Sequence, residues 1–266
     1  MSEVTVENRL LSRVGTIVAP ERSLLGQYFL AVDSDMRRLK LALSVHVDMD
    51  QFDVVCQETG KFVPNAFRPD MTPIVPGDAL WFQARDSADR LIATFAVRCY
   101  RMPYKTLGDW LSTGALFYEN PIRQMPEGER LFLGKDADAY ARTVRHSCTF
   151  IGGLAITDQY RGRTNLAEVM TTLGCAIALA RWDAAPMISI AEDEVFAKNQ
   201  NKYRFDVARS GVFWHRPHKP QRTRMWLLAR TRSAVLADLA EFLNADPNQR
   251  TRVMPRVQPE PMVAAQ

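Results

Sequence analysis

The feature that most constrains the fold is an apolar segment that ends in a polar loop and is followed by a segment with helical periodicity. Residues 148–157 (CTFIGGLAIT) are apolar and β-branched, which predicts a buried strand, and their Gly-Gly pair predicts a bulge or a close backbone approach. Residues 158–164 are polar, and apolar residues at helical spacing return over 165–182. A strand, a loop and a helix in this order predict a mixed α/β fold with a crossover connection.

The loop after this strand has the composition of an anion-binding site. The free N–H groups of a helix's first turn, together with the helix dipole, attract phosphate groups. Arg161 and Arg163 add two full positive charges, and Gly162 allows a backbone path that brings amides close to a ligand. Thr164 or Asn165 is the expected N-cap, and we expect Glu168 to close a capping box from Asn165.

The rest of the chain supplies the remaining elements of one domain over residues 1–245. We predict a short strand at 15–19, one long or two short helices over 23–44, a hairpin of 79–85 with 91–101, a strand at 186–190, a helix at 195–203, a strand pair at 211–216 and 224–230, and a serine-capped helix at 233–244. Residues 246–266 contain four prolines and are predicted to be a disordered tail.

The composition is that of an ordinary globular protein. Of 266 residues, 47% are hydrophobic and 24% are charged, and no stretch approaches the roughly 20 apolar residues that span a bilayer. The N-terminal segment has no apolar signal region, so we expect a cytoplasmic location. The four cysteines form no CxxC pair and are expected to be buried, reduced thiols, and the four histidines are too scattered to predict a metal site.

Positive charge is concentrated in one segment near the C-terminus. Residues 202–232 contain nine Lys or Arg against one acid, whereas the whole chain has a net charge of only +4. Such a segment favours an anionic ligand, with a solvated basic surface as the alternative. A nucleic-acid partner is not expected, because no known motif is present and aromatic residues are not interleaved as a stacking platform.

The strand, loop and helix together resemble the GNAT superfamily of N-acetyltransferases. The resemblance is carried by LAIT (154–157), QYRGR (159–163) and LAEVM (166–170). The sequence departs from the family where a second glycine is usual, because Thr164 and Asn165 stand there and the small residue arrives later, as Ala167.

This resemblance implies a central twisted, mostly antiparallel sheet with flanking helices and an acyl-CoA co-substrate, with no metal. The pantetheine of CoA would pair along the strand in a gap between two neighbouring strands, and the diphosphate would bind the loop amides. The implied cofactor-binding residues are Leu154, Ala155, Ile156, Thr157, Arg161, Gly162, Arg163, Thr164, Asn165, Leu166, Ala167 and Asn199. Tyr203 is the implied general acid, and the general base is Glu192, Glu194 or Asp158, of which we favour Glu192.

The function that follows is transfer of an acetyl or other acyl group from acyl-CoA to an amine acceptor of unspecified identity. Two alternatives remain open: a non-catalytic acyl-CoA-binding regulatory module, and an enzyme like the N-acyl amino acid or acyl-homoserine-lactone synthases, whose donor can be an acyl carrier protein. A homodimer is a reasonable expectation, and a membrane partner is not.

Overall fold

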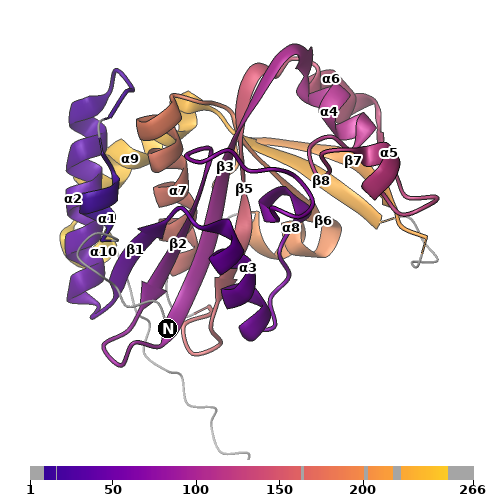
Figure 1. The fold of residues 1–266 in the computed structure, drawn as a ribbon. Coiled ribbons are helices and arrows are strands. Elements are labelled where there is room, and N and C mark those ends of the chain that lie inside the picture. Colours follow the sequence, from indigo (N-terminus) through magenta and orange to yellow (C-terminus); the bar gives the residue numbers. More distant parts are fainter. Residues whose placement is uncertain (1–8, 16, 163–164, 201–202, 218–222, 251–266) are drawn as a thin grey trace, which may run out of the picture.

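The computed structural model describes residues 9–15, 17–162, 165–200, 203–217 and 223–250. They form a mixed α/β fold, in which one eight-stranded sheet is flanked by helices (Figure 1). The strand order is β1-β2-β3-β5-β6-β8-β7-β4, and every neighbouring pair is antiparallel except β5 with β6. The predicted mixed α/β fold, with a mostly antiparallel sheet and flanking helices, is therefore confirmed.

Helices and strands are interspersed along the described chain. The strands are β1 (Ala42–His46), β2 (Ala79–Arg85), β3 (Leu91–Thr106), β4 (Arg130–Leu133), β5 (Arg145–Ile156), β6 (Met187–Glu192), β7 (Val207–His215) and β8 (Thr223–Arg230). The helices are α1 (Leu10–Arg13), α2 (Arg22–Arg38), α3 (Met49–Glu58), α4 (Leu107–Thr113), α5 (Pro121–Gln124), α6 (Lys135–Ala141), α7 (Leu166–Trp182), α8 (Asp193–Asn199), α9 (Arg232–Asn244) and α10 (Pro247–Arg250), with a 3-10 turn at Asn65–Phe67.

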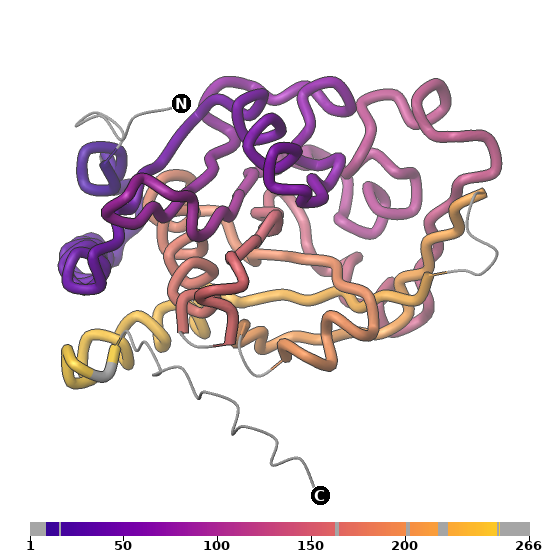
Figure 2. The backbone as a smooth tube through the Cα atoms, turned by 90° about the horizontal axis from the view of Figure 1, so that it is seen from below, coloured from indigo at the N-terminus to yellow at the C-terminus, as the bar shows by residue number. Residues whose placement is uncertain are grey.

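The sheet separates two hydrophobic cores. One core contains buried residues of α2, α7 and α9, and the other contains buried residues of α3, α4 and α6. Figure 2 shows this division, with α3 in dark purple on one side and α7 in salmon and α9 in yellow on the other. Because each face of the sheet is covered by a different set of helices, a ligand that reaches both cores has to pass through the sheet.

The predicted strand–loop–helix unit is present with nearly the predicted bounds. β5 is apolar as predicted, and α7 is buried over most of its length against the sheet. The chain then turns at Asp183, which has a φ of 51°, and enters β6 parallel to β5. α7 is thus the crossover helix of the only parallel pair among the described strands.

Two predictions for the N-terminal region are wrong. The helix predicted over 23–44 ends at Arg38, because Lys40 adopts a left-handed conformation with φ of 59°, and residues 42–46 then form β1 at the edge of the sheet. The segment 15–19 is not a strand in its described residues. Its Val18 amide instead donates a hydrogen bond to the carbonyl of Ala180 on α7.

The chain after β3 also differs from prediction. β4 was not predicted, and it pairs with β7 at the far edge of the sheet. α8 ends at Asn199 rather than at Tyr203, and α9 is capped by the Thr231 hydroxyl rather than by a serine. Residues 247–250 of the predicted disordered tail form α10, and residues 251–266 lie outside the described part of the chain.

Candidate functional site

β5 and β6 separate soon after they begin to pair, and this opens the sheet. Their parallel register covers only Thr149 with Met187 and Phe150 with Ile188. Beyond that point β5 continues to pair with β3 on its other side, and β6 continues to pair with β8. The facing edges of the two strands are therefore exposed to each other across a gap in the middle of the sheet.

The bulge predicted from the glycine pair lies beside this gap. The register between β3 and β5 shifts between Thr94, which pairs with Ala155, and Ala96, which pairs with Gly152, so that Gly153 lies within the shift. Gly153 has a φ of 63°, and a Cβ atom there would lie 2.7 Å from the ring of Phe52. The backbone of β5 thus approaches an aromatic ring closely where it bends away from β6, as the glycines predicted.

A cavity of about 540 Å³ occupies the gap between β5 and β6. Its wall includes Phe95, Ile151 and Leu154, which belong to the core that contains α7. It also includes Phe117 and Trp214, which belong to the core that contains α3. The cavity is therefore bordered by residues from both faces of the sheet.

The edge of β5 has donors and acceptors directed into the gap. The amide of Thr157 bonds to the carbonyl of Ile92 on β3, so the peptide groups of Thr157 and Ala155 face β3. Because backbone groups alternate in direction along a strand, the peptide groups of Ile156 and Leu154 face away from β3, toward the gap. The backbone groups of Leu154 and the amide of Ile156 are therefore available for the predicted contacts with a ligand, whereas the Ile156 carbonyl already accepts from Arg161. The Thr157 hydroxyl is buried and has no hydrogen-bond partner among the described residues.

The predicted diphosphate loop leads from this edge to α7. The guanidinium of Arg161 donates to the carbonyl of Ile156 at 3.1 Å and pairs with Asp158 at 3.0 Å. Gly162 has a φ of 72° and no neighbouring atom within 4 Å of an added Cβ, so the space beside it is open. Arg163 and Thr164 lie outside the described residues.

The start of α7 agrees only in part with prediction. Asn165 is the N-cap, but its side chain makes no capping bond and donates instead to the carbonyl of Arg250. Glu168 pairs with Arg204 at 2.7 Å, so the predicted capping box does not form. The side chain of Leu166 is buried in the core, and Leu166 and Ala167 can contribute only their backbone amides to a ligand.

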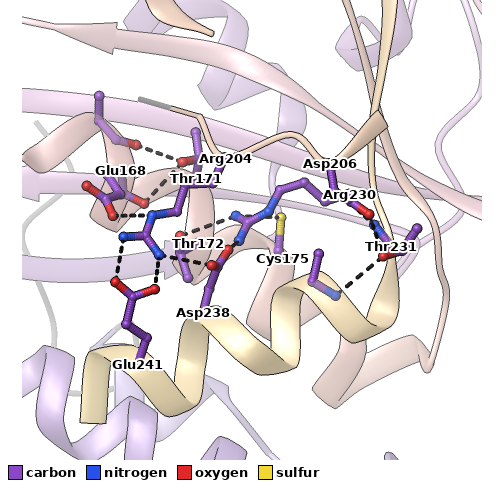
Figure 3. A network of polar contacts seen from close by, with 12 residues as sticks. Glu168, Thr171, Thr172, Cys175, Arg204, Asp206, Arg230, Thr231, Asp238 and Glu241 are labelled. Carbon is purple, nitrogen blue, oxygen red and sulfur yellow. Dashed lines mark hydrogen bonds and ion pairs between the residues drawn. The ribbon is translucent and has the colours of Figure 1, made fainter. Parts of the chain in front are cut away.

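Several arginines of the positively charged segment 202–232 form ion pairs within the protein. Arg204 pairs with Glu168, Asp238 and Glu241, and the fully buried Arg230 pairs with Asp238 and donates to Thr172 and Cys175 (Figure 3). Arg232 in turn pairs with Glu21 and Asp183. These arginines join α7, α9 and β8 to one another, and they are not available to an anionic ligand. Lys202, Lys219 and Arg222 lie outside the described residues.

Two of the predicted catalytic residues line the cavity. Glu192 stands at the end of β6, and Tyr203 follows α8 in a turn in which its amide bonds to the carbonyl of Asn199. Burial raises the pKa of Tyr203, which favours the protonated phenol. Asn199 itself is not part of the cavity wall, and its side chain donates to the carbonyl of Val195.

The other two candidate bases are placed differently. Asp158 is 89% exposed and pairs with Arg161, and Glu194 is 88% exposed and lies 3.8 Å from Lys198. Neither lines the cavity. Of the three candidate bases, Glu192 alone lines the cavity.

A second group of polar residues in the cavity was missed by sequence reasoning. Glu129 is buried and accepts hydrogen bonds from the hydroxyl of Tyr118 at 2.9 Å and from the indole of Trp214 at 2.7 Å. The guanidinium of Arg216 stacks on the same indole, 4.5 Å from its ring centre. Glu129 lies in a proline- and charge-rich stretch without periodicity, so only the tertiary structure brings it to the cavity.

The remaining chemistry-bearing residues are structural. All four cysteines are free and buried, as predicted, and burial raises the pKa of the Cys56 and Cys99 thiols to about 11. Within the described residues no group of histidine, cysteine and acidic side chains could hold a metal ion. None of the described helices has the length and apolar character needed to span a bilayer.

No protein-family model and no curated protein matches this sequence. Among solved structures, NAA60 from Arabidopsis thaliana in complex with acetyl-CoA is similar over 71% of this chain and 99% of that chain, with 10% identity and a TM-score of 0.41. An acyl-CoA N-acyltransferase from Pseudomonas aeruginosa is similar over 72% of this chain and 99% of that chain, with 14% identity and a TM-score of 0.40.

Proposed function

We propose that this chain is an acyl-CoA-dependent N-acyltransferase that moves an acyl group directly to an amine. The observation that carries the proposal is the cavity between β5 and β6, which is bordered by residues from both cores. Direct transfer needs a thioester and an amine held in contact while each enters by its own route. A passage through a sheet meets this requirement, because the two substrates can approach from opposite faces.

The donor would lie along the edge of β5 and reach the start of α7. Pantetheine carries amide groups that can pair with the peptide groups of Leu154 and Ile156, as an added strand does. The diphosphate would bind at Arg161–Ala167, where the positive end of the α7 dipole and the Arg161 guanidinium attract it. The contacts of Arg161 with Asp158 are largely exposed and therefore weak, so exchanging them for a diphosphate costs little.

The chemistry uses the two titratable groups that line the gap. The amine nitrogen forms a bond to the thioester carbon, and the bond from that carbon to sulfur breaks. Glu192 accepts the proton that the amine loses, and Tyr203 gives its proton to the departing thiolate. The raised pKa of Tyr203 keeps the phenol protonated, so its hydroxyl can donate a hydrogen bond to the sulfur as the thiolate leaves.

The first prediction tests donor binding. Acetyl-CoA at about 100 times its dissociation constant should raise the melting temperature by about 5 °C or more, as expected for a ligand that binds only the folded state. Arg161→Glu should weaken CoA binding by about tenfold or more, because it places a negative charge beside the diphosphate. Isothermal titration calorimetry measures both affinities, and the melting temperature without ligand shows whether the variant folds.

Arg209→Glu is the matched control, because Arg209 is an exposed arginine on β7 and does not line the cavity. It should bind CoA as the wild type does. Absence of any stabilisation by CoA, acetyl-CoA and longer acyl-CoAs would contradict the proposal. Stabilisation without release of free thiol across a panel of amines would instead identify a non-catalytic acyl-CoA-binding module.

A further inference from the structure

The end of the cavity on the α3 side contains an acidic group with an unusual set of partners. Glu129 immediately precedes β4, the edge strand that pairs with β7. Both of its hydrogen-bond donors, the Tyr118 hydroxyl and the Trp214 indole, bind the same oxygen, Oε1. Within the described residues, no donor binds Oε2 and no cation pairs with the carboxylate.

A buried carboxylate with neutral donors on one oxygen is suited to binding a cation with the other. Burial of a negative charge without a cationic partner is costly, and a ligand ammonium would supply that partner. Burial and the bond to Glu129 raise the pKa of Tyr118, so its hydroxyl remains a donor to the carboxylate. Tyr118 and Trp214 therefore orient Glu129 and leave Oε2 for the ligand.

A positive group stands next to the same indole. Arg216 is half-buried, lines the cavity, and stacks over the face of Trp214, whereas Glu129 lies at the indole's N–H edge. Unlike Arg204 and Arg230, Arg216 has no ion pair with any described residue. Stacking on an aromatic ring leaves the edge of a guanidinium open for a bidentate bond to a carboxylate.

The part of the cavity wall that packs against Trp214 is apolar. Phe117 and Phe150 line the cavity there and pack edge to face, with ring centres 6.0 Å apart. Phe117 also packs on Trp214, with ring centres 4.8 Å apart. A ligand that satisfies this end of the cavity therefore needs an ammonium group, a carboxylate and an apolar side chain.

We infer that the amine acceptor is an α-amino acid with an apolar side chain, whose ammonium group binds Glu129 and whose carboxylate binds Arg216. That the amino acid is a substrate rests on the proposed function. That it binds at this end of the cavity can be tested without any acyl transfer. In such an amino acid the α-carbon carries the ammonium and the carboxylate close together. Glu129 and Arg216 are likewise close together, because both contact the indole of Trp214. A simple amine would leave Arg216 without a partner, and a simple carboxylate would leave Glu129 without one.

The test compares three probes that differ only in these charges: L-phenylalanine, 2-phenylethylamine and 3-phenylpropanoate. Titration calorimetry on the full chain without CoA should show L-phenylalanine binding about tenfold or more tightly than either analogue, because each analogue lacks one charged hydrogen bond. Arg216→Gln should remove the preference over 2-phenylethylamine, and Glu129→Gln should remove the preference over 3-phenylpropanoate.

Arg224→Gln is the matched control, since Arg224 belongs to the same basic segment but is not part of the cavity wall. It should keep both preferences. Because Glu129→Gln removes a buried charge, its folding is checked by thermal unfolding, and Arg216→Gln gives an independent test if it does not fold. Equal affinity for the three probes, no binding of L-phenylalanine, or an unchanged preference in Arg216→Gln would overturn the inference.

The same probes separate this inference from the proposed function. Binding of L-phenylalanine without any binding of acyl-CoA would leave the zwitterion site standing and remove the acyltransferase. Acylation of 2-phenylethylamine as efficiently as of L-phenylalanine would keep the acyltransferase and remove the amino acid specificity.

Discussion

The guanidinium group of arginine has three different environments in this chain. Arg230 is completely buried and balanced by Asp238, Arg161 donates to an exposed strand carbonyl, and Arg216 stacks on an indole in the cavity. Arginine suits all three because its charge is delocalised, weakly hydrated and planar. The sequence shows only that these residues are positive, so it cannot separate the structural arginine from those that a ligand can reach.

At the residue scale, Tyr203→Phe should lower kcat by about a hundredfold while the dissociation constant for CoA stays within about twofold, as expected for loss of a general acid. The hydroxyl is removed without changing the shape of the cavity wall. Steady-state kinetics with thiol detection measures the first value, and calorimetry measures the second. Tyr104→Phe is the control, because Tyr104 is fully exposed, and it should change neither. An unchanged kcat in Tyr203→Phe would remove this tyrosine from the mechanism.

At the scale of elements, the divergence of β5 from β6 depends on how β5 bends. The bend lies at the Gly152–Gly153 bulge, where β5 passes directly over the rings of Phe67 and Phe52. β5 is fixed by β3 on one side, and β6 is fixed by β8, so neither strand can move to close the gap. The cavity is thus a consequence of strand pairing and not of loop conformation.

Gly153→Ala should therefore destabilise the protein strongly. Gly153 has a φ of 63°, and the added Cβ would lie 2.7 Å from Phe52. Gly60→Ala is a close control, because Gly60 has a φ of 64° but no atom within 4 Å of an added Cβ. Both variants carry the left-handed strain, of about 1 kcal/mol, and only Gly153→Ala adds overpacking, of about 1–3 kcal/mol.

Urea unfolding of the two variants measures the difference directly. A free energy of unfolding that falls equally in both would show that Phe52 moves aside at little cost. The bulge would then not be held by close packing against the ring of Phe52.

At the scale of the whole molecule, stability should fall as the solution is acidified below neutral pH. His46 is buried, stacks on Trp81 and bonds to Ser44 and Gln83. Burial lowers the pKa of His46 from 6.5 to about 4. The unfolded chain therefore binds a proton between pH 6.5 and about 4 that the folded chain does not, and stability decreases as the pH falls through this window.

The slope from this one histidine is at most about 1.4 kcal/mol per pH unit. Urea unfolding at pH 7, 6 and 5 measures it, and His46→Gln should flatten it. His146→Asn is the control, because His146 is exposed, and it should keep the wild-type slope. Below pH 4.5 the free energy of unfolding should fall further. Ion pairs and hydrogen bonds lower the pKa of Glu21, Asp109 and Glu241, and protonation of these carboxylates removes those interactions. A free energy of unfolding that is constant between pH 7 and 5 would contradict the role of His46.

Local patterns predicted much of the fold. The hairpin of β2 and β3, the strand–loop–helix unit of β5 and α7, and the strand pair of β7 and β8 were all predicted from periodicity and turn residues. β4 was missed because it is only four residues long and lies between loops. Of the candidate site, Leu154, Glu192 and Tyr203 were predicted and line the cavity, whereas Glu129 and Arg216 were not predicted as a pair.

The sequence by itself determined the elements of this protein, because backbone periodicity and turn chemistry act over a few neighbouring residues. It also determined that a polar glycine loop connects a buried strand to a long helix. Only the tertiary structure decided that β5 and β6 part, that Arg204, Arg230 and Arg232 are neutralised by acids far along the chain, and that Glu129 meets Arg216 across Trp214. Those outcomes depend on contacts between residues distant in sequence, for which no local pattern exists.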